Sequence, residues 1–516
     1  MTIEQGNGEM TEKANVCENK LVEESDIVKS RYSPLCRQFV AAIGCTATTI
    51  SVGMTIGYSA ILLPELQHPS SRIHVDLEIA SWIASIALLP MAFGCLVAGY
   101  LMDRFGRKMT ILALNVPFTV GWCIISMSDC MFWLLFGRIL TGFCCGVLSP
   151  TTPMYLSEIS APKYRGFFLA SITLDVALGV LLTHFLAIYC TWNVNAIVCG
   201  FLPFIGYIAT TFVPESPSWL LKKNCIHEAH HAFVWLRGCD ESASIEFQSM
   251  VDAQIKNSAA TSAQHSDDDT ENNGSGAGRQ HHPIDHLRQL IAHKSFNTPL
   301  IILSIYFATL QFSGVNAVIF YTVTILKDSL SGTDIDEYVA TLVIDAVRLV
   351  AALIACIVVK CAGRRPLTIF SGGSTAICLF GLSYYLSLSA ENSLRNYASI
   401  PLALFVIYTL VLSVGINPLP WCLTGELFPL RYRAIGSAFV TAFNFLCFFT
   451  VVKTSPIYFS IYGGSKMFCF YGILTAIGTI FLTLVLPETK NKSLQEIEDN
   501  YTVKRKHKMS RNKVQP

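Results

Sequence analysis

Long apolar runs separated by short charged loops dominate the chain. Stretches without Asp, Glu, Lys or Arg run over 38–64, 79–102, 109–128, 139–157, 176–214, 298–326, 366–390, 396–425, 434–452 and 467–487. A helix needs about 20 mostly apolar residues to cross a hydrocarbon core about 30 Å thick. The run 176–214 is long enough for two helices with a turn near Cys190–Asn195, and 338–359 is apolar apart from two charges. The pattern predicts an all-α membrane protein with twelve transmembrane helices, six on each side of residues 214–297.

The few charged residues of the chain are concentrated in three segments. Only 14% of the 516 residues are charged, whereas soluble domains carry about 25%. Residues 1–37, 214–297 and 487–516 hold 42 of the 73 charges. This distribution argues against a soluble multidomain protein, a nucleic-acid binder and a secreted disulfide scaffold. It predicts two polar tails, helical bundles over 38–213 and 298–486, and a polar linker between them.

The loop charges predict the orientation. Lys and Arg favour cytoplasmic loops, and the loops after helices 2, 4, 8 and 10 hold ten of them, against four in the opposite loops. Both termini and the linker are therefore expected in the cytoplasm. Residues 1–37 contain no apolar segment typical of a cleavable signal peptide. The low-complexity stretch 258–282 is predicted to be disordered.

The two predicted bundles repeat each other. Three motifs recur in the same order, each just past an even-numbered helix and at a nearly constant separation along the chain: Gly106-Arg107-Lys108 with Gly363-Arg364-Arg365, Glu158-x6-Arg165 with Glu426-x6-Arg433, and Pro214-Glu215-Ser216 with Pro487-Glu488-Thr489. Such parallel repeats are typical of transporters built from two six-helix units with a site between them. The sequence therefore predicts two pseudo-symmetric six-helix bundles.

The same motifs carry a family resemblance over about residues 37–500. The relevant segments are Gly99-x3-Asp103-Arg104-Phe105-Gly106-Arg107-Lys108, Arg138 with Gly142 and Gly146, Pro214-Glu215-Ser216-Pro217, Pro418-x-Pro420-Trp421 and Glu426-Leu427-Phe428-Pro429. Together they resemble the sugar porter family of the major facilitator superfamily. The segments Glu78-x2-Ser81-Trp82 and Phe233-x-Trp235-Leu236-Arg237-Gly238 are most similar to the insect facilitated trehalose/glucose transporter group.

The resemblance implies a gate of charged side chains that closes the cytoplasmic side in the outward-open state. Its expected members are Asp103, Arg104, Arg107, Arg138, Glu158, Arg165, Arg364, Glu426 and Arg433. Topology alone would explain the arginines, but it would not explain the recurring Glu-x6-Arg spacing. Arg138 is expected near the cytoplasmic face of helix 4, where it either snorkels or pairs with Glu158 or Glu426.

Neutral polar side chains are the candidates for substrate contact. Gln311 and Asn316 lie in an otherwise apolar stretch, and each amide offers both a donor and an acceptor to a sugar hydroxyl. The resemblance implies that the central cavity is lined by these two residues together with Thr173, Tyr321, Trp421 and Asn444. The alternative for a membrane Asn or Gln is a hydrogen bond between helices. No cofactor, metal site, nucleic-acid partner or obligate protein partner is expected.

The chain departs from the family pattern at several positions. They include Leu310, Asn417, Phe445 and Lys360-Cys361. Three charges also lie deep in predicted helices, namely Asp175, Asp345 and Arg348, and such charges usually mark pairing or function. In one hypothesis the three form a buried ion network that tethers the two halves. In the other, Arg348 binds an anionic or strongly polar substrate, or Asp175 titrates during proton coupling.

The expected activity is transport without covalent chemistry, rather than enzymatic catalysis. The resemblance implies a multi-pass plasma-membrane protein that moves a hexose or trehalose by alternating access. Helix 1 has no acidic residue between Phe39 and Pro64, where proton symporters of the family place an aspartate, and this favours facilitated diffusion. The alternatives are a proton-coupled or anion/polyol carrier of the same fold, and a non-transporting sugar sensor.

Overall fold

The structure is a computed structural model that describes residues 33–67, 75–252, 254–255, 294–319, 337–390, 399–428 and 433–489. All regular secondary structure in these ranges is helical. The predicted disordered stretch 258–282, Tyr321, and nearly all of the two predicted tails lie outside the described residues.

The helices before the linker form the first half of the molecule. Their bounds are α2 (Pro34–Gln67), α3 (Leu77–Ser85), α4 (Leu88–Phe105), α5 (Arg107–Ser126), α6 (Met131–Ile159), α7 (Pro162–Tyr189) and α8 (Trp192–Thr211). The break between α7 and α8 falls at Cys190, where the sequence predicts a turn. Since α3 and α4 are two pieces of one span, the first half contains six spans.

The second half follows the linker, in which residues 241–252 are also helical. The linker contains α9 (Pro217–Lys222) and α10 (Ile226–Arg237), and the second half contains α13 (Lys294–Gln311), α15 (Glu337–Cys361), α16 (Arg364–Ala390), α17 (Ser399–Val414), α18 (Leu419–Leu427) and α19 (Arg433–Val485). Eleven helical segments of the described chain are long and apolar enough to cross a membrane. The last contains a non-helical residue, Gly463, with φ of 79°, and is two helices joined at that residue. Counted in this way, the described helices are consistent with the predicted twelve spans.

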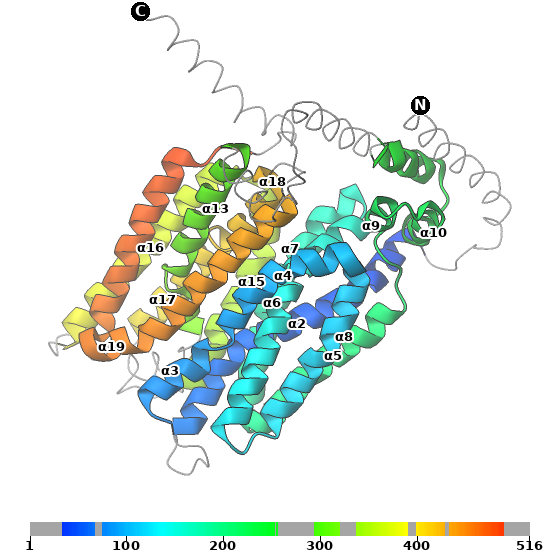
Figure 1. Cartoon of the computed structure of the whole chain (residues 1–516). Helices are drawn as coiled ribbons and strands as arrows, with labels where there is room; N and C mark the ends of the chain where they lie inside the picture. Colours follow the sequence, from blue (N-terminus) through cyan, green and yellow to red (C-terminus); the bar gives the residue numbers. More distant parts are fainter. Residues whose placement is uncertain are drawn as a thin grey trace, which may run out of the picture.

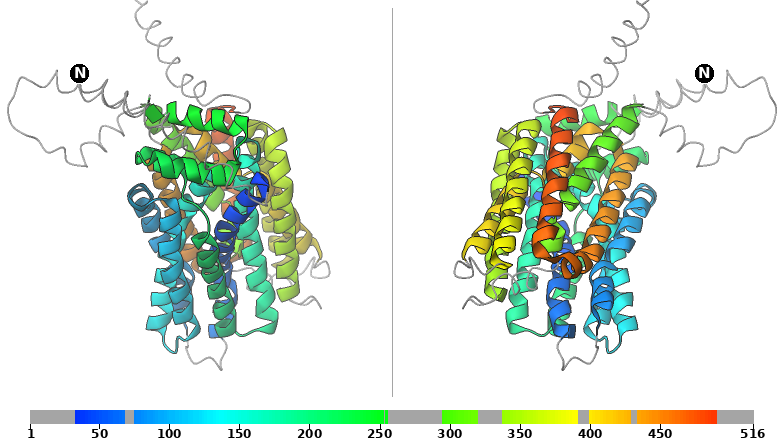
Figure 2. Two further views of the ribbon diagram at one scale, coloured as in Figure 1. Left: turned by 90° about the vertical axis from the view of Figure 1, so that its right-hand side faces the viewer. Right: turned by 90° about the vertical axis from the view of Figure 1, so that its left-hand side faces the viewer.

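The helices run roughly parallel to one another in two groups (Figure 1). The groups touch where α3 and α4 pack against α19, and where α7 packs against α15. The linker helices α9 and α10 lie at one end of the bundle (Figure 2). We call this the motif end, because α4 ends and α5 begins there at Gly106. The other end, which holds α3 and the Gly463 break of α19, is called the opposite end (Figure 1).

Two spans of the second half are interrupted. Helix α13 ends at Gln311 in a turn at Phe312–Gly314, and Gly314 has a φ of 82° that favours glycine. The span built from α17 and α18 is broken between Val414 and Leu419, next to Pro418 and Pro420, which cannot donate backbone hydrogen bonds. Side chains from other helices satisfy backbone groups at these breaks: the Ile416 N–H donates to the Ser371 hydroxyl at 2.9 Å, and the Ser313 carbonyl accepts from the Tyr408 hydroxyl at 2.9 Å.

Two helices extend past the ends of the charge-free runs. The run 139–157 becomes α6, which starts at Met131 and contains Arg138. The run 434–452 becomes the first part of α19, which continues through Lys453. Both cations find polar partners within the bundle, so a charge does not end the helix there.

Helix α6 approaches α3 and α4 backbone to backbone. A Cβ at Gly142 would lie 2.2 Å from the carbonyl oxygen of Ala87, and a Cβ at Gly146 would lie 2.2 Å from that of Met91. Small residues permit this close packing in membrane bundles, where dispersion contacts replace the hydrophobic effect as the force between helices. The contact positions α6 for the charged network at its C-terminal end.

We predict that Gly146→Ala destabilises the fold, because the added methyl group would overlap backbone atoms of α4. Overpacking of this kind costs about 1–3 kcal/mol. Thermal denaturation followed by the loss of the monodisperse peak in size-exclusion chromatography measures the effect. Gly99→Ala is the matched control, since no heavy atom lies within 4 Å of a Cβ at that helical glycine. Equal midpoints for the two variants would contradict the prediction.

Candidate functional site

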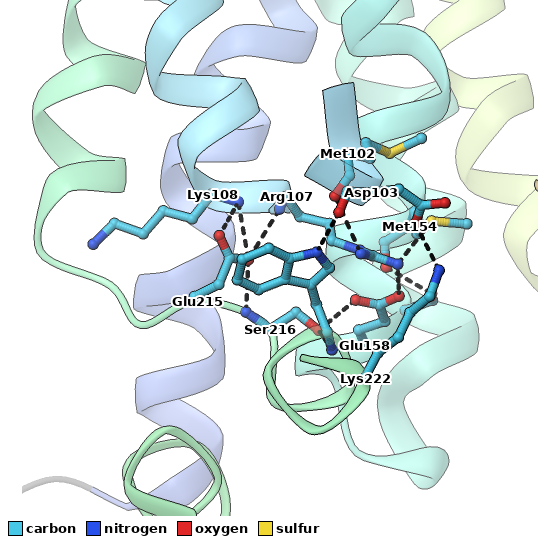
Figure 3. A network of polar contacts seen from close by, with 11 residues as sticks. Met102, Asp103, Arg107, Lys108, Met154, Glu158, Glu215, Ser216 and Lys222 are labelled. Carbon is cyan, nitrogen blue, oxygen red and sulfur yellow. Dashed lines mark hydrogen bonds and ion pairs between the residues drawn. The ribbon is translucent and has the colours of Figure 1, made fainter. Parts of the chain in front are cut away.

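The motif end of the first half holds a network of charged and hydroxyl side chains (Figure 3). Arg107, the first residue of α5, places Nη2 at 3.0 Å from Oε1 of Glu158, near the end of α6. The hydroxyl of Ser216 donates to the other oxygen of Glu158. Because both side chains of the ion pair are largely buried, the pair joins α5, α6 and the segment after α8 with little competition from water.

A second carboxylate caps α5. Oε1 of Glu215 accepts hydrogen bonds from the backbone N–H groups of Arg107 at 3.0 Å and Lys108 at 3.1 Å, and Oε2 accepts from Lys108 at 3.0 Å. The first N–H groups of a helix have no partner within the helix, and they favour a negative charge. Glu215 therefore fixes the start of α5 to the end of α8 (Figure 3).

The second half contains the same arrangement. Arg364 reaches both carboxylate oxygens of Glu426, with Nη2–Oε1 at 2.8 Å and Nε–Oε2 at 3.4 Å. The hydroxyl of Thr489 donates to Oε2 of Glu426 at 2.5 Å. Glu488 accepts from the backbone N–H groups of Arg364 at 2.9 Å and Arg365 at 3.1 Å. The repeat found in the sequence is thus a repeat of contacts: arginine, glutamate, capping glutamate and hydroxyl recur in both halves.

The other expected gate residues lie nearby. Nζ of Lys222 forms an ion pair with Oδ1 of Asp103 at 3.0 Å, and both side chains are about half exposed. Arg104 and Arg165 are exposed, and Nε of Arg165 donates to the carbonyl of Ser157 at 3.0 Å. The side chain of Arg433 lies outside the described part of the structure. Among the described residues, every ion pair at the motif end lies within one half.

The prediction for Arg138 is wrong. This residue lies in the second turn of α6, which begins at the opposite end, so Arg138 is far from the motif end and from Glu158. Its guanidinium is fully buried within the first half, where it donates to the Ser59 hydroxyl and to the carbonyl of Thr55 at 3.3 Å. It also lies 5.9 Å from the ring centroid of Tyr58. Successive spans run in opposite directions, so the fourth span starts at the opposite end. A residue near its start, such as Arg138, therefore belongs at that end.

The predicted substrate amides form a continuous hydrogen-bonded chain. Nε2 of Gln311 donates to Oδ1 of Asn444 at 2.7 Å, and Nδ2 of Asn316 donates to Oε1 of Gln311 at 2.5 Å. Gln311 and Asn444 are buried, and Asn316 is partly exposed. The chain crosses the break after α13 and reaches α19, so it also joins two helices.

Trp421 and Thr173 have different surroundings. Trp421 on α18 is 37% exposed, and its ring packs edge-on against Phe307 with centroids 5.0 Å apart. The partly exposed Thr173 uses its hydroxyl within its own helix, donating to the carbonyl of Ala170 at 2.9 Å. Trp421 is therefore a rigid aromatic face on the broken span, whereas Thr173 makes no described contact to the amide chain.

The deep charges divide into two separate environments. Asp345 and Arg348 pair on one face of α15 at 2.6 Å, as their spacing predicts. The third partner is His184 of α7, whose Nδ1 hydrogen bonds to Asp345 while Nε2 lies 3.1 Å from the carbonyl of Gly57. Both ring nitrogens thus lie within hydrogen-bond distance of oxygen atoms on other helices.

Asp175 is not part of this network, contrary to the expectation that it reaches Arg348. In the described chain its hydrogen bond comes from Thr46 of α2. Its Oδ2 atom is buried without a hydrogen-bond partner among the described residues. The physical reason is that Asp175 faces α2, whereas His184, farther along α7, faces both α2 and α15.

Three residues of these networks, His184, Glu215 and Glu488, are not among the site residues that the sequence predicts. The sequence pattern considers only Asp, Glu, Lys and Arg as charged, so it gives no signal for His184. Glu215 and Glu488 stand in the repeated Pro-Glu-Ser/Thr motif, and their matching place in the internal repeat is the signal that marks them as equivalent. Their capping role becomes visible only once the starts of α5 and α16 are known.

Comparisons with known proteins decide the family. Residues 38–501 match the family described as sugar (and other) transporter. The chain belongs to this family. It is 31% identical over 463 residues to the facilitated trehalose transporter Tret1 of Polypedilum vanderplanki, covering 89% of this chain and 87% of the relative. It is 30% identical over 465 residues to the transporter of the same name from Apis mellifera ligustica, covering 90% and 88%.

Solved structures agree on the fold. The proton:xylose symporter XylE, bound to 6-bromo-6-deoxy-D-glucose, matches with a TM-score of 0.69 at 20% identity, covering 91% of this chain and 99% of that one. The partially occluded inward-open xylose transporter XylE from E. coli matches with a TM-score of 0.68 at 18% identity, covering 89% and 100%. The sugar porter chain thus has the major facilitator fold expected from its repeated motifs.

We predict that Glu158→Gln strongly destabilises the first half, because Arg107 is then left buried without a counter-charge. Breaking a buried pair on one side costs about 3–5 kcal/mol. The double variant Arg107→Gln/Glu158→Gln should recover part of the loss, and thermal unfolding in detergent measures both. Lys222→Met is the control, since its exposed pair contributes about 0–1 kcal/mol. A loss for Lys222→Met as large as that for Glu158→Gln would refute the assignment.

Proposed function

We propose that the protein moves a neutral sugar, trehalose or a hexose, across the plasma membrane by facilitated diffusion. The observation that carries this proposal is the amide chain of Asn444, Gln311 and Asn316 at the break of the seventh span. Relatives of similar length that are about 30% identical to this chain are named facilitated trehalose transporters. The proposal places both termini in the cytoplasm on the basis of the loop charges.

The chemistry of the amide chain fits a polyhydroxyl solute. Each carboxamide has two N–H donors and an oxygen that accepts two hydrogen bonds, so Gln311 and its two partners do not exhaust their capacity on one another. The partly exposed Asn316 is the member most open to a ligand. Trp421 offers an exposed indole that can cover an apolar sugar face. We include Thr173 and Tyr321 in the site as further proposed contacts.

The two motif-end networks support movement of each half as a unit. Arg107–Glu158 ties together the ends of α5 and α6, and Ser216 adds the segment after α8. Arg364–Glu426 and Thr489 do the same for α16, α18 and the segment after α19. Rigid halves with few polar contacts between them suit alternating access, in which one bundle rocks against the other around a central site.

The buried charges favour a neutral solute. Arg348 is paired with Asp345 at 2.6 Å, so its positive charge is already balanced before any substrate binds. Helix α2 contains no Asp or Glu between Phe39 and Pro64, which supports transport without a proton. Asp175, with its unpartnered Oδ2 among the described residues, is the observation that favours proton coupling as a second candidate.

Counterflow in proteoliposomes tests the function. Purified full-length protein is reconstituted with labelled trehalose, glucose and a panel of small organic anions, with and without a proton gradient. We expect flux of trehalose or glucose that does not respond to the gradient. Flux that requires the gradient, and that loses this requirement in Asp175→Asn, would establish proton coupling instead. Anion flux alone, or no flux of any solute, would overturn the proposal.

We predict that Gln311→Leu weakens sugar binding more than it slows turnover. Removing one buried amide partner costs about 1–3 kcal/mol, which corresponds to a KM increase of roughly five- to 150-fold. Counterflow kinetics measure KM, and size-exclusion chromatography verifies that the variant is folded. Gln248→Leu removes an exposed amide from the linker region and is the control. An unchanged KM in a folded Gln311→Leu variant would show that the amide serves only to join helices.

A further inference from the structure

Lys453 of α19 reaches across from the second half to the first. Its Nζ donates to the Ser81 hydroxyl at 2.7 Å and lies 3.9 Å from the ring centroid of Trp82, both on α3. Glu78, on the same short helix, contributes a favourable charge interaction. An ammonium group over an indole face is the strongest form of the cation–π contact. The segment Glu78-x2-Ser81-Trp82, which resembles the insect transporter group, therefore binds the side chain of Lys453 in this structure.

His184 also joins the two halves, through the contact between α7 and α15. Its ring joins α7 of the first half to Asp345 on α15 of the second half, and it is 4% exposed. Since Arg348 also pairs with Asp345, the histidine is held against an ion pair that belongs entirely to the second half. The contact can separate while Asp345 keeps a partner.

The internal repeat relates these two residues. The separation between His184 and Lys453 along the chain nearly equals that between Glu158 and Glu426, two matched members of the repeat. His184 and Lys453 therefore occupy equivalent positions on the fifth and eleventh spans. Each points across the boundary between the halves toward a span that starts at the opposite end.

Both contacts lie in the part of the bundle away from the motif end. His184 is close to the end of α7 at Tyr189, and Ser81 lies in the first turns of α3. The third described hydrogen bond between the halves, from Sγ of Cys356 to the carbonyl of Ala170, is 3.7 Å long and uses a weak thiol donor. The strong polar contacts described between the halves are thus concentrated at the opposite end, whereas those at the motif end lie within each half.

We propose that His184 and Lys453 form a pseudo-symmetric clasp that holds the two halves together at the opposite end, and that both contacts must separate before solute can enter from that side. The proposal rests on alternating access in the proposed function, but it does not depend on which solute is carried. It explains why a lysine and a histidine are kept inside apolar helices, where isolated charges are costly.

Hydrogen–deuterium exchange of the full-length protein in lipid nanodiscs tests the clasp without any substrate. The variants are Lys453→Met, His184→Leu and the combination of the two. We expect amide exchange at the opposite end, in residues 78–86 and 449–455, to become roughly threefold faster or more as the open population rises. Exchange at the motif end, in residues 154–160 and 424–428, should slow down, because closing that end accompanies opening of the other.

Controls separate a shifted equilibrium from damage to the fold. Lys466→Met removes the same charge at an exposed site beyond the Gly463 break of the same helix and should leave exchange unchanged. Lys453→Arg keeps the cation over Trp82 and should restore the wild-type pattern. Faster exchange at both ends, or unchanged exchange in the double variant, would overturn the proposal. Either result would leave the counterflow test of sugar transport unaffected.

Discussion

The pairing of one arginine with one glutamate at the ends of neighbouring helices is the interaction on which the rest of the structure depends. Arg107–Glu158 and its equivalent Arg364–Glu426 lie where three helices of each half come together. Around each pair a second glutamate satisfies the free N–H groups of a helix start. These ion pairs and capped helix starts thus join neighbouring helices, and they make the motif end of each bundle rigid.

Rigidity within each half makes the contacts between the halves decisive. The halves meet through α3 and α4 against α19 and through α7 against α15. Apolar contacts in a membrane distinguish weakly between one arrangement and another, because lipid is an equally good partner. A few polar contacts, such as those of His184 and Lys453, can therefore decide which end of the molecule is closed.

Most of the architecture is predictable because the bilayer restricts the possible structures so strongly. Apolar length predicts the span count, and the nearly constant separation between matched motifs predicts the two halves. The pairing of Asp345 with Arg348 on one helix follows from their spacing, but inferences about buried charges with partners on other helices fail. The pattern places Arg138 at the wrong end, gives Asp175 the wrong partner, and gives no signal for the contact of Lys453 with α3. In each case the partner comes from another helix, such as Ser59 for Arg138, and a single sequence contains no direct record of which helices face each other.

The candidate substrate site also depends on helix contacts that the sequence does not reveal. Gln311 and Asn316 are identifiable as polar residues in an apolar run, but the hydrogen bond from Gln311 to Asn444 requires the break at Phe312–Gly314 and the packing of α13 on α19. The three amides hydrogen bond to one another, and each keeps donors or acceptors that the proposed sugar can use. Binding energy at such a site depends on the geometry of the hydroxyl groups rather than on charge.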